Sequence, residues 1–355
     1  MDSPSRIFVL NSEMITATGP TTEMNYLAAY PAGISGIKMS CELDHAFDGI
    51  KLGSVPEAII PPLDKKLEPL GLTTRQRRLL RLCHDPLVEL VNAFENKKPL
   101  PLFLAGPEQL PDKKPAMSGE FLNHLGQQTG LVFDKAMSRI FTTGRAAGLE
   151  AIDIAFRYFE ATGEDYAIVG GVDTAADLHY LSNLSVEGRL LAEDVKDGFN
   201  PGEAACFMLV TSEKGYQQRQ SDAIKHHAIY PPGIAYEPGH YYSDEPYLGE
   251  GLAKAFAQAL KRSEIGDLQA VHTSMNGENY FAKELGVAMT RNQAAFADNV
   301  VITHPAEAFG DIGAAFAPVL ISMVTSPRNT TTEASLIYCS SDGPTRAAMV
   351  VGRKM

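Results

Sequence analysis

Short apolar runs alternate with longer amphipathic segments along most of the chain. Apolar runs bounded by glycine, proline or small polar residues predict strands, and apolar residues spaced three and four apart predict helices. The predicted strands are RIFVLN, LPLFLAG, SRIFTT, YAIVGG, CFMLVTS, LQAVHTS, NVVITH, SLIYCS and AAMVVG, and the predicted helices cover 76–95, 145–160, 250–263, 279–288 and 310–324. Proline- and glycine-rich stretches at 53–72, 106–119 and 231–250 predict long loops. This alternation is typical of a layered α/β fold.

A faint long repeat relates the two halves of the chain. SRIFTTGRAAGLEAIDIAFRYF, YAIVGGVDTAAD and AACFMLVTSE are echoed in the same order by NVVITHPAEAFGDIGAAFAPVLISMV, SLIYCSSDGPTR and AAMVVGRK. Small residues fill the helix of each copy, which predicts that the two helices approach closely at the centre of the molecule. These are Ala146, Ala147, Gly148 and Ala151 in the first copy and Gly310, Gly313, Ala314 and Ala315 in the second. We expect the halves to span 1–212 and 213–355 and to form one compact unit.

Composition excludes several classes of function. The 355 residues are 45% hydrophobic and 21% charged, as in a globular protein with a sizeable core. A formal net charge of -12 argues against nucleic acid or an anionic membrane as the main partner. No run approaches the roughly 20 apolar residues of a membrane span, and the start MDSPSRIFVLNSEM does not resemble a signal peptide. We therefore expect a cytoplasmic protein.

The cysteines and the basic residues predict no dedicated chemistry. Cys41, Cys83, Cys206 and Cys339 are spread too widely for a zinc site and are too few for a disulfide scaffold, so they are expected to serve as small hydrophobic residues, with no metal or cofactor. The basic run RQRRLLRL at 75–82 predicts an amphipathic helix with a solvated face, or else a surface that docks something acidic.

Three segments resemble the β-ketoacyl carrier-protein synthases of the thiolase superfamily. RIFVLNSEMITATGPTTEMNYLAAYPAGISGI is similar to their opening strand, turn and first helix, and GRAAGLEAIDIAFRYFEATGEDYAIVGGVDT to their nucleophile helix and the strand after it. VKDGFNPGEAACFMLVTSEK resembles the segment that closes their first half, and its structural motif comprises Asp197, Gly198, Phe199, Gly202 and Glu203. The resemblance implies a thiolase-like fold, with two pseudo-repeated βαβαβαββ halves in a five-layer α/β/α/β/α sandwich.

The same resemblance implies that the active site is degenerate. Active members use a cysteine at the start of the central helix and two histidines from the second half, which support decarboxylation and condensation. Here Arg145 falls on the cysteine position, Ser274 on the first histidine position and Glu307 on the second. A shift of two residues would bring His272 onto the first histidine position. No catalytic residue is therefore expected at these places.

Each substitution has alternative interpretations. Arg145 is either a surface arginine or a plug that faces Glu307 in a charge-assisted pair, and Glu307 is otherwise an exposed acid at a helix start. His272 and His304 are expected to form structural hydrogen bonds, with a residual catalytic site as the alternative. The tyrosines of GHYYSDEPYLGEG are expected to pack within their loop or to line an entrance.

The resulting hypothesis is a catalytically inactive ketosynthase-like accessory subunit, comparable to a chain-length factor or an adaptor. It implies a homodimer, or a heterodimer with a related subunit, formed through the strand SRIFTT, and it implies a carrier protein or a client protein as a further partner. Two alternatives stay open. One is a non-covalent acyl hydrolase or decarboxylase that uses His272, His304 or Glu307, and the other is a scaffold or adaptor in a bacterial effector-delivery cluster.

Overall fold

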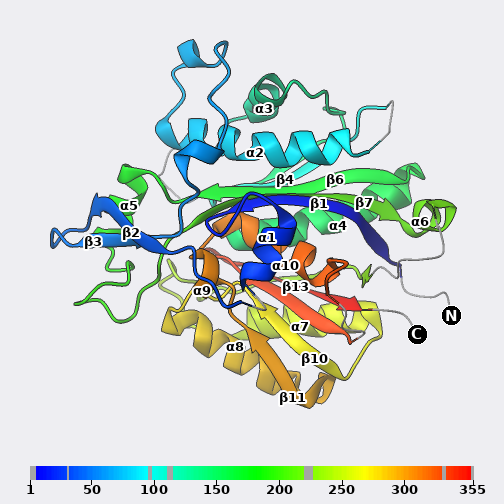
Figure 1. Ribbon diagram of the computed structural model, residues 1–355. Helices are drawn as coiled ribbons and strands as arrows, with labels where there is room; N and C mark the ends of the chain where they lie inside the picture. Colours follow the sequence, from blue (N-terminus) through cyan, green and yellow to red (C-terminus); the bar gives the residue numbers. More distant parts are fainter. Residues whose placement is uncertain are drawn as a thin grey trace.

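The computed structural model describes residues 5–29, 32–94, 98–109, 115–219, 227–329 and 333–352 (Figure 1). The strands are β1 (Ile7–Thr16), β2 (Lys38–Leu43), β3 (Gly49–Leu52), β4 (Leu102–Ala105), β5 (Arg139–Phe141), β6 (Tyr166–Thr174), β7 (Glu203–Ser212), β8 (Ala228–Ile229), β9 (Gly233–Tyr236), β10 (Leu268–Thr273), β11 (Phe296–Thr303), β12 (Ser335–Ser340) and β13 (Thr345–Gly352). The α-helices are α1 (Thr22–Ala29), α2 (Thr74–Asn92), α3 (Phe121–Thr129), α4 (Ala147–Thr162), α5 (Leu178–Val186), α6 (Glu213–Arg219), α7 (Glu250–Ser263), α8 (Asn279–Arg291), α9 (Ala306–Phe309) and α10 (Phe316–Thr325).

The strand order of the first half recurs in the second. The order β5-β4-β6-β7-β1 in the first half corresponds to β11-β10-β12-β13-β8 in the second. In each set the first three strands are parallel and the fourth runs antiparallel to the third. β1 pairs with β8 and joins the two sets into one continuous sheet. This symmetry agrees with the repeat seen in the sequence, and the residue numbers that divide the halves stay a prediction.

Three hydrophobic clusters define the layers of the molecule. The central cluster includes α4, α10 and the facing side chains of both strand sets. A second cluster packs α2 and α3 on the outer face of the first set, and a third packs α7 and α8 on the outer face of the second set (Figure 1). The α/β/α/β/α sandwich predicted from the sequence is therefore confirmed.

The small residues predicted for the two central helices allow them to touch. A Cβ atom added to Gly148 of α4 would lie 2.7 Å from the Cβ of Ala317 and 2.6 Å from the Cδ of Pro318 in α10. No side chain fits in that space, so the close approach of α4 and α10 depends on this glycine.

Every predicted strand and helix has a counterpart, with two kinds of error. The helix predicted at 310–324 begins at Phe316, because Gly310 has a φ of +75° and ends the short helix α9 before a second turn leads into α10. The pattern also missed the hairpin β2–β3, the short strands β8 and β9, and the short helices α3, α5, α6 and α9. β9 lies within the stretch 231–250 that was predicted as a loop. On β2 the outward residues include Met39 and Leu43, so apolar side chains lie on the exposed face and conceal the usual strand pattern.

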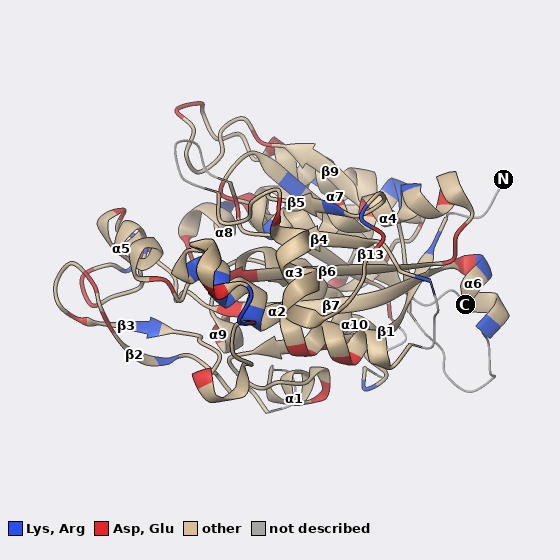
Figure 2. Ribbon diagram, turned by 90° about the horizontal axis from the view of Figure 1, so that it is seen from above, with Lys and Arg blue, Asp and Glu red and all other residues tan. Residues whose placement is uncertain are grey.

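The prediction that the basic run forms a solvated helix face holds for Arg77, which is exposed, and fails for Arg75, Arg78 and Arg81. α2 begins with a cap in which Thr73 and Gln76 exchange side-chain and backbone hydrogen bonds. Arg75 then pairs with Asp173 at 3.0 Å, and Arg78 pairs with Glu203 at 2.5 Å. Figure 2 shows basic and acidic positions side by side around this helix. Arg75 and Arg78 therefore connect the helix to the strand ends beside it.

The motif around Glu203 fixes the centre of the first half. Glu203 is fully buried, and its carboxylate also accepts hydrogen bonds from the backbone N–H of Val55 at 2.8 Å and the hydroxyl of Thr174 at 2.6 Å. A Cβ atom added to Gly202 would clash with the backbone oxygen of Phe309, so a side chain is excluded there.

The other members of the motif hold neighbouring segments. Asp197 accepts a hydrogen bond from the backbone N–H of Asn279 at 2.7 Å, at the start of α8. Gly198 packs against the backbone of Arg189, and the ring of Phe199 lies 5.2 Å from its guanidinium carbon. The motif therefore connects the first half to segments of the second.

No helix in the described ranges combines the length and the apolar character needed to span a bilayer. Three of the four cysteines are buried, as expected for small hydrophobic residues. Cys41 is exposed on β2, so the expectation fails for this cysteine.

Candidate functional site

Arg145 lies on a single 3₁₀ turn, Gly144–Ala146, that leads directly into α4. The turn follows β5 and lies within the core, and the Arg145 side chain is only 7% exposed. The backbone N–H of Ala146 donates to the hydroxyl of Ser341 at 3.1 Å, so this amide at the helix start already has a partner. An anion or a thiolate therefore has one fewer donor to bind at this helix start.

Two carboxylates from the second half surround the Arg145 guanidinium. Its Nε donates to both oxygens of Asp311 at 3.1 Å, and its Nη2 also contacts Asp311. Its Nη1 donates to Asp342 at 2.7 Å. The ring of Phe281 lies 4.9 Å from the guanidinium carbon and closes one side. These contacts satisfy a cation beside a helix start, where the backbone alone would disfavour it.

A second buried arginine extends the network. Arg189, which is 1% exposed, makes a bidentate contact with Glu278 at 2.8 and 2.6 Å and donates to Asp342 at 2.7 Å. Asn276 donates to Asp311 at 3.0 Å and to Glu278 at 2.9 Å, which links the two arginine sites. We call Arg145, Arg189, Glu278, Asp311 and Asp342 the central ion cluster.

The cluster shifts the protonation of its acids. Burial alone would raise the pKa of Asp342, but the guanidinium groups of Arg145 and Arg189 outweigh it and hold that pKa below its usual range. Glu108 lies beside them and accepts hydrogen bonds from the backbone N–H groups of Asp342 and Gly343 at 3.0 and 2.6 Å. Burial, together with the charge of Asp342, raises the pKa of Glu108 to about 8. The surroundings therefore favour the ionised form of Asp342 and disfavour the ionised form of Glu108.

Little space remains at this centre. The cavity beside Arg145 has a volume of about 40 Å³, and six ionisable side chains line it: Arg75, Glu108, Arg145, Asp173, Asp311 and Asp342. A few water molecules fill such a volume, whereas small-molecule sites usually have roughly 300 Å³ or more. No group of three His, Cys, Asp or Glu side chains in the described parts of the chain is placed to hold a metal ion.

The predicted pair of Arg145 and Glu307 is wrong. Glu307 is exposed on α9, and the acid that faces Arg145 is Asp311, four residues further along. α9 ends at Phe309, and the positive φ of Gly310 redirects the backbone so that Asp311 enters the core. The interpretation of Glu307 as an exposed acid at a helix start is the correct one.

The remaining predicted site residues do not converge. Ser274 is buried and accepts a hydrogen bond from the backbone N–H of Ser340 at 3.1 Å. His272 lies 2.9 Å from the hydroxyl of Thr303 and borders a cavity with Met323, whereas His304 and Glu307 border a different cavity with Ser35. The structure thus separates His272 from the other two members of the alternative catalytic set.

Most members of the central ion cluster were not predicted from the sequence, although two of them carried a signal. Asp342 lies two residues after a buried strand, and Asp311 lies between two glycines, Gly310 and Gly313, in an otherwise apolar segment. Acidic side chains in such surroundings are seldom buried without a partner. Asp311 and Asp342 could therefore have indicated a buried basic residue nearby. Tyr242 was expected to pack within its loop, but its hydroxyl accepts a hydrogen bond from Arg189 at 2.9 Å.

Comparison with solved structures identifies the fold. The molecule has the fold of ketosynthases, with an ion cluster at the start of the central helix. No protein-family model matches the chain, and no curated protein matches it in sequence.

Similar solved structures are ketosynthases. A cysteine-to-serine mutant of the ketosynthase from module 6 of the bacillaene synthase of Bacillus subtilis 168 superposes with a TM-score of 0.75 at 14% identity, over 99% of this chain and 72% of that chain. The oxazolomycin ketosynthase domain OzmH KS7 of Streptomyces albus JA3453 gives 0.73 at 13% identity, over 99% and 75%. The ishigamide ketosynthase/chain length factor gives 0.72 at 14% identity, over 99% and 100%.

Removal of one member of the central ion cluster is expected to destabilise the fold strongly. Arg145→Ala and Asp311→Ala should each lower the free energy of unfolding by about 3 to 5 kcal/mol, because each leaves buried charge without its partner. The double variant should lose clearly less than the sum of the two. Denaturant unfolding measures all three. Glu307→Ala is the matched control and should change stability by less than about 0.5 kcal/mol; a larger effect there than at Asp311 would contradict this account.

A second expectation concerns His272. Burial lowers its pKa to about 4, so the folded protein binds fewer protons than the unfolded chain between that value and the ordinary pKa of about 6.5. The contribution of neutral His272 to the free energy of unfolding is therefore fully present above pH 6.5. It falls as the pH drops toward 4, by up to about 1.4 kcal/mol per pH unit. His272→Gln, which does not titrate, should flatten this slope in unfolding experiments. An unchanged slope in the variant would show that His272 is not the group responsible.

Proposed function

We propose that this protein is a ketosynthase-like partner subunit that carries out no covalent condensation and acts by binding other proteins. One observation carries the proposal. Arg145 lies at the start of α4, where the resemblance to ketosynthases places the nucleophile. Its guanidinium forms ion pairs with Asp311 and Asp342. A guanidinium in this state offers no lone pair for attack on a thioester.

The thiols of the chain give further support to this proposal. Nucleophilic cysteine chemistry needs a thiolate near a base or a helix start. Burial raises the pKa of Cys339 to about 12 and raises the pKa values of Cys83 and Cys206 as well. Cys41 is exposed on β2, outside the central ion cluster.

The class of partner follows from the fold and from the neighbours. One similar structure is the ishigamide ketosynthase/chain length factor, and another is a type II polyketide synthase acyl-carrier protein in complex with its ketosynthase, with a TM-score of 0.69 at 15% identity. β5 ends the sheet here, and it pairs with β4 alone within the described residues. An unpaired strand edge is a template for another strand. We therefore propose that β5 pairs with β5 of a second copy or with a strand of a related ketosynthase. We also propose a carrier protein as a further partner.

The proposal predicts that no acyl-enzyme forms. After incubation with an acyl thioester under conditions that load an active ketosynthase, intact-mass spectrometry should show the unmodified chain. Cys41→Ser is the control variant, because it removes the exposed thiol and with it any slow surface labelling. A stoichiometric acyl adduct that persists in Cys41→Ser would overturn the proposal.

Pairing through β5 predicts a dimer. Light scattering at micromolar concentration should give either twice the 38.4 kDa chain mass for the protein alone, or the sum of 38.4 kDa and the partner's mass for a one-to-one complex with a related ketosynthase. Ile140→Lys on β5 should weaken that assembly at least tenfold, because it places a charge at the joining edge. Val301→Lys on β11, the end strand at the other side of the sheet, is the matched control and should leave it intact. A monomer under both conditions would refute the pairing.

A further inference from the structure

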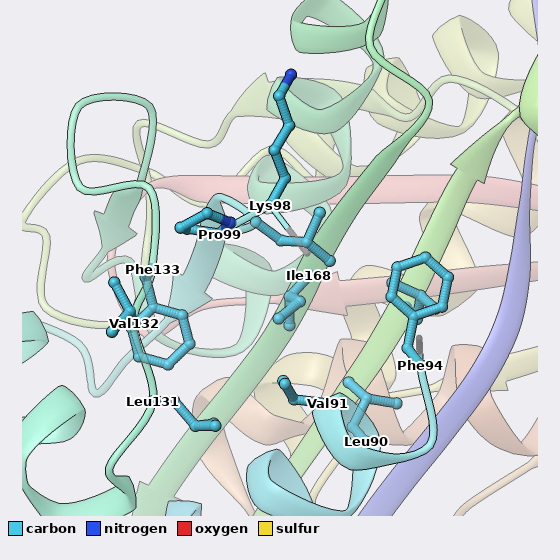
Figure 3. A pocket seen from close by; sticks show the side chains of 11 residues that line it. Leu90, Val91, Phe94, Lys98, Pro99, Leu131, Val132, Phe133 and Ile168 are labelled. Carbon is cyan, nitrogen blue, oxygen red and sulfur yellow. The ribbon is translucent and has the colours of Figure 1, made fainter. Parts of the chain in front are cut away.

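An apolar pocket lies on the outer face of the first strand set, and it shares no lining residue with the cavity beside Arg145. Its floor is formed by Ile168 of β6 and Leu209 of β7, which are 2% and 3% exposed. Figure 3 shows Val91 at the end of α2 on one side and Leu131 and Phe133 on the other. The pocket has a volume of about 200 Å³.

A space of this kind favours hydrocarbon. Protein interiors are close-packed, and an apolar cavity of about 150 Å³ stays dry and binds benzene. None of the residues that line the pocket carries a buried polar side-chain atom without a hydrogen-bond partner. The walls therefore offer an occupant dispersion contacts and no buried donor or acceptor that needs a partner.

The pocket continues into a second, more polar crevice. The two share Lys98, Pro99, Leu100 and Phe133, and the second has a volume of about 580 Å³. Its walls carry charged groups of both signs and two tyrosines: Lys98, Lys135, Asp134, Glu164, Asp165, Tyr158 and Tyr166. Lys98 and Glu164 pair with each other at 2.7 Å, so neither supplies an isolated charge. This wall suits an uncharged group that both donates and accepts hydrogen bonds.

We infer that the two spaces form one binding site for an amphipathic small molecule. A hydrocarbon segment of about six carbons occupies the apolar pocket, and an uncharged, hydroxyl-rich head occupies the crevice. The apolar pocket lies on the outer face of the first strand set, and the crevice reaches Tyr158 near the end of α4. Neither space shares a lining residue with the cavity beside Arg145, so the site is separate from the central ion cluster.

Hexyl β-D-glucoside is a suitable probe because it combines these two parts. Calorimetric titration into the full chain should show saturable binding with one site. Glucose, the head alone, should not bind, and 1-hexanol, the tail alone, should bind at least tenfold more weakly. Failure of hexyl glucoside to saturate would overturn the inference, and equal affinity for hexanol would overturn the assignment of the crevice to the head.

Filling the pocket provides the second arm of the test. Val91→Trp places a large ring in the apolar pocket and should weaken binding at least tenfold. Val300→Trp on β11, another half-buried valine, is the matched control and should bind as the unmodified chain does. Circular dichroism checks that both variants fold, and Leu131→Phe fills the pocket from the opposite wall if Val91→Trp does not. Unchanged affinity in the folded filling variant would show that the probe binds elsewhere.

Discussion

Two arginines buried at the centre of the molecule require carboxylates from distant parts of the chain. Arg145 contacts Asp311 and Asp342, which lie 166 and 197 residues further along. Arg189 contacts Glu278 and shares Asp342. A desolvated charge without a partner costs several kcal/mol, so the five segments that carry these residues must reach their positions together. The central ion cluster thus joins the two halves at the end of the sheet where α4 begins.

This cluster also decides what the centre can do. Buried ion pairs contribute little net stability, because desolvation offsets much of their attraction, but they strongly restrict geometry. The donors of both guanidinium groups point at protein oxygens, and the remaining cavity holds only a few waters. A fold that elsewhere forms ketosynthase centres therefore has a small, highly charged cavity at this position.

Buried acids outside the central ion cluster are also paired with arginines, on α2. Arg75 and Arg78 of α2 are 18% and 13% exposed and reach Asp173 and Glu203 at the ends of β6 and β7. Glu203 in turn holds the backbone of Val55 and the hydroxyl of Thr174. Arg75 and Arg78, which were predicted to face solvent, therefore have a structural role. Each one pairs with a buried acid at the end of a strand, and a buried acid without a partner would be costly.

The sequence by itself determined the layered α/β architecture, the repeat and the close contact of α4 and α10. These features depend on local patterns, namely apolar periodicity, glycine and proline positions, and small residues on one helix face, which are read over short windows. The sequence also placed Arg145 at the start of the central helix. Only the tertiary structure decided the partner of Arg145. Glu307 lies on the exposed side of α9, and the positive φ of Gly310 turns the backbone so that Asp311 reaches Arg145 instead. Ion pairs between residues more than a hundred positions apart depend on how whole helices and strands pack. A short stretch of sequence does not contain that information.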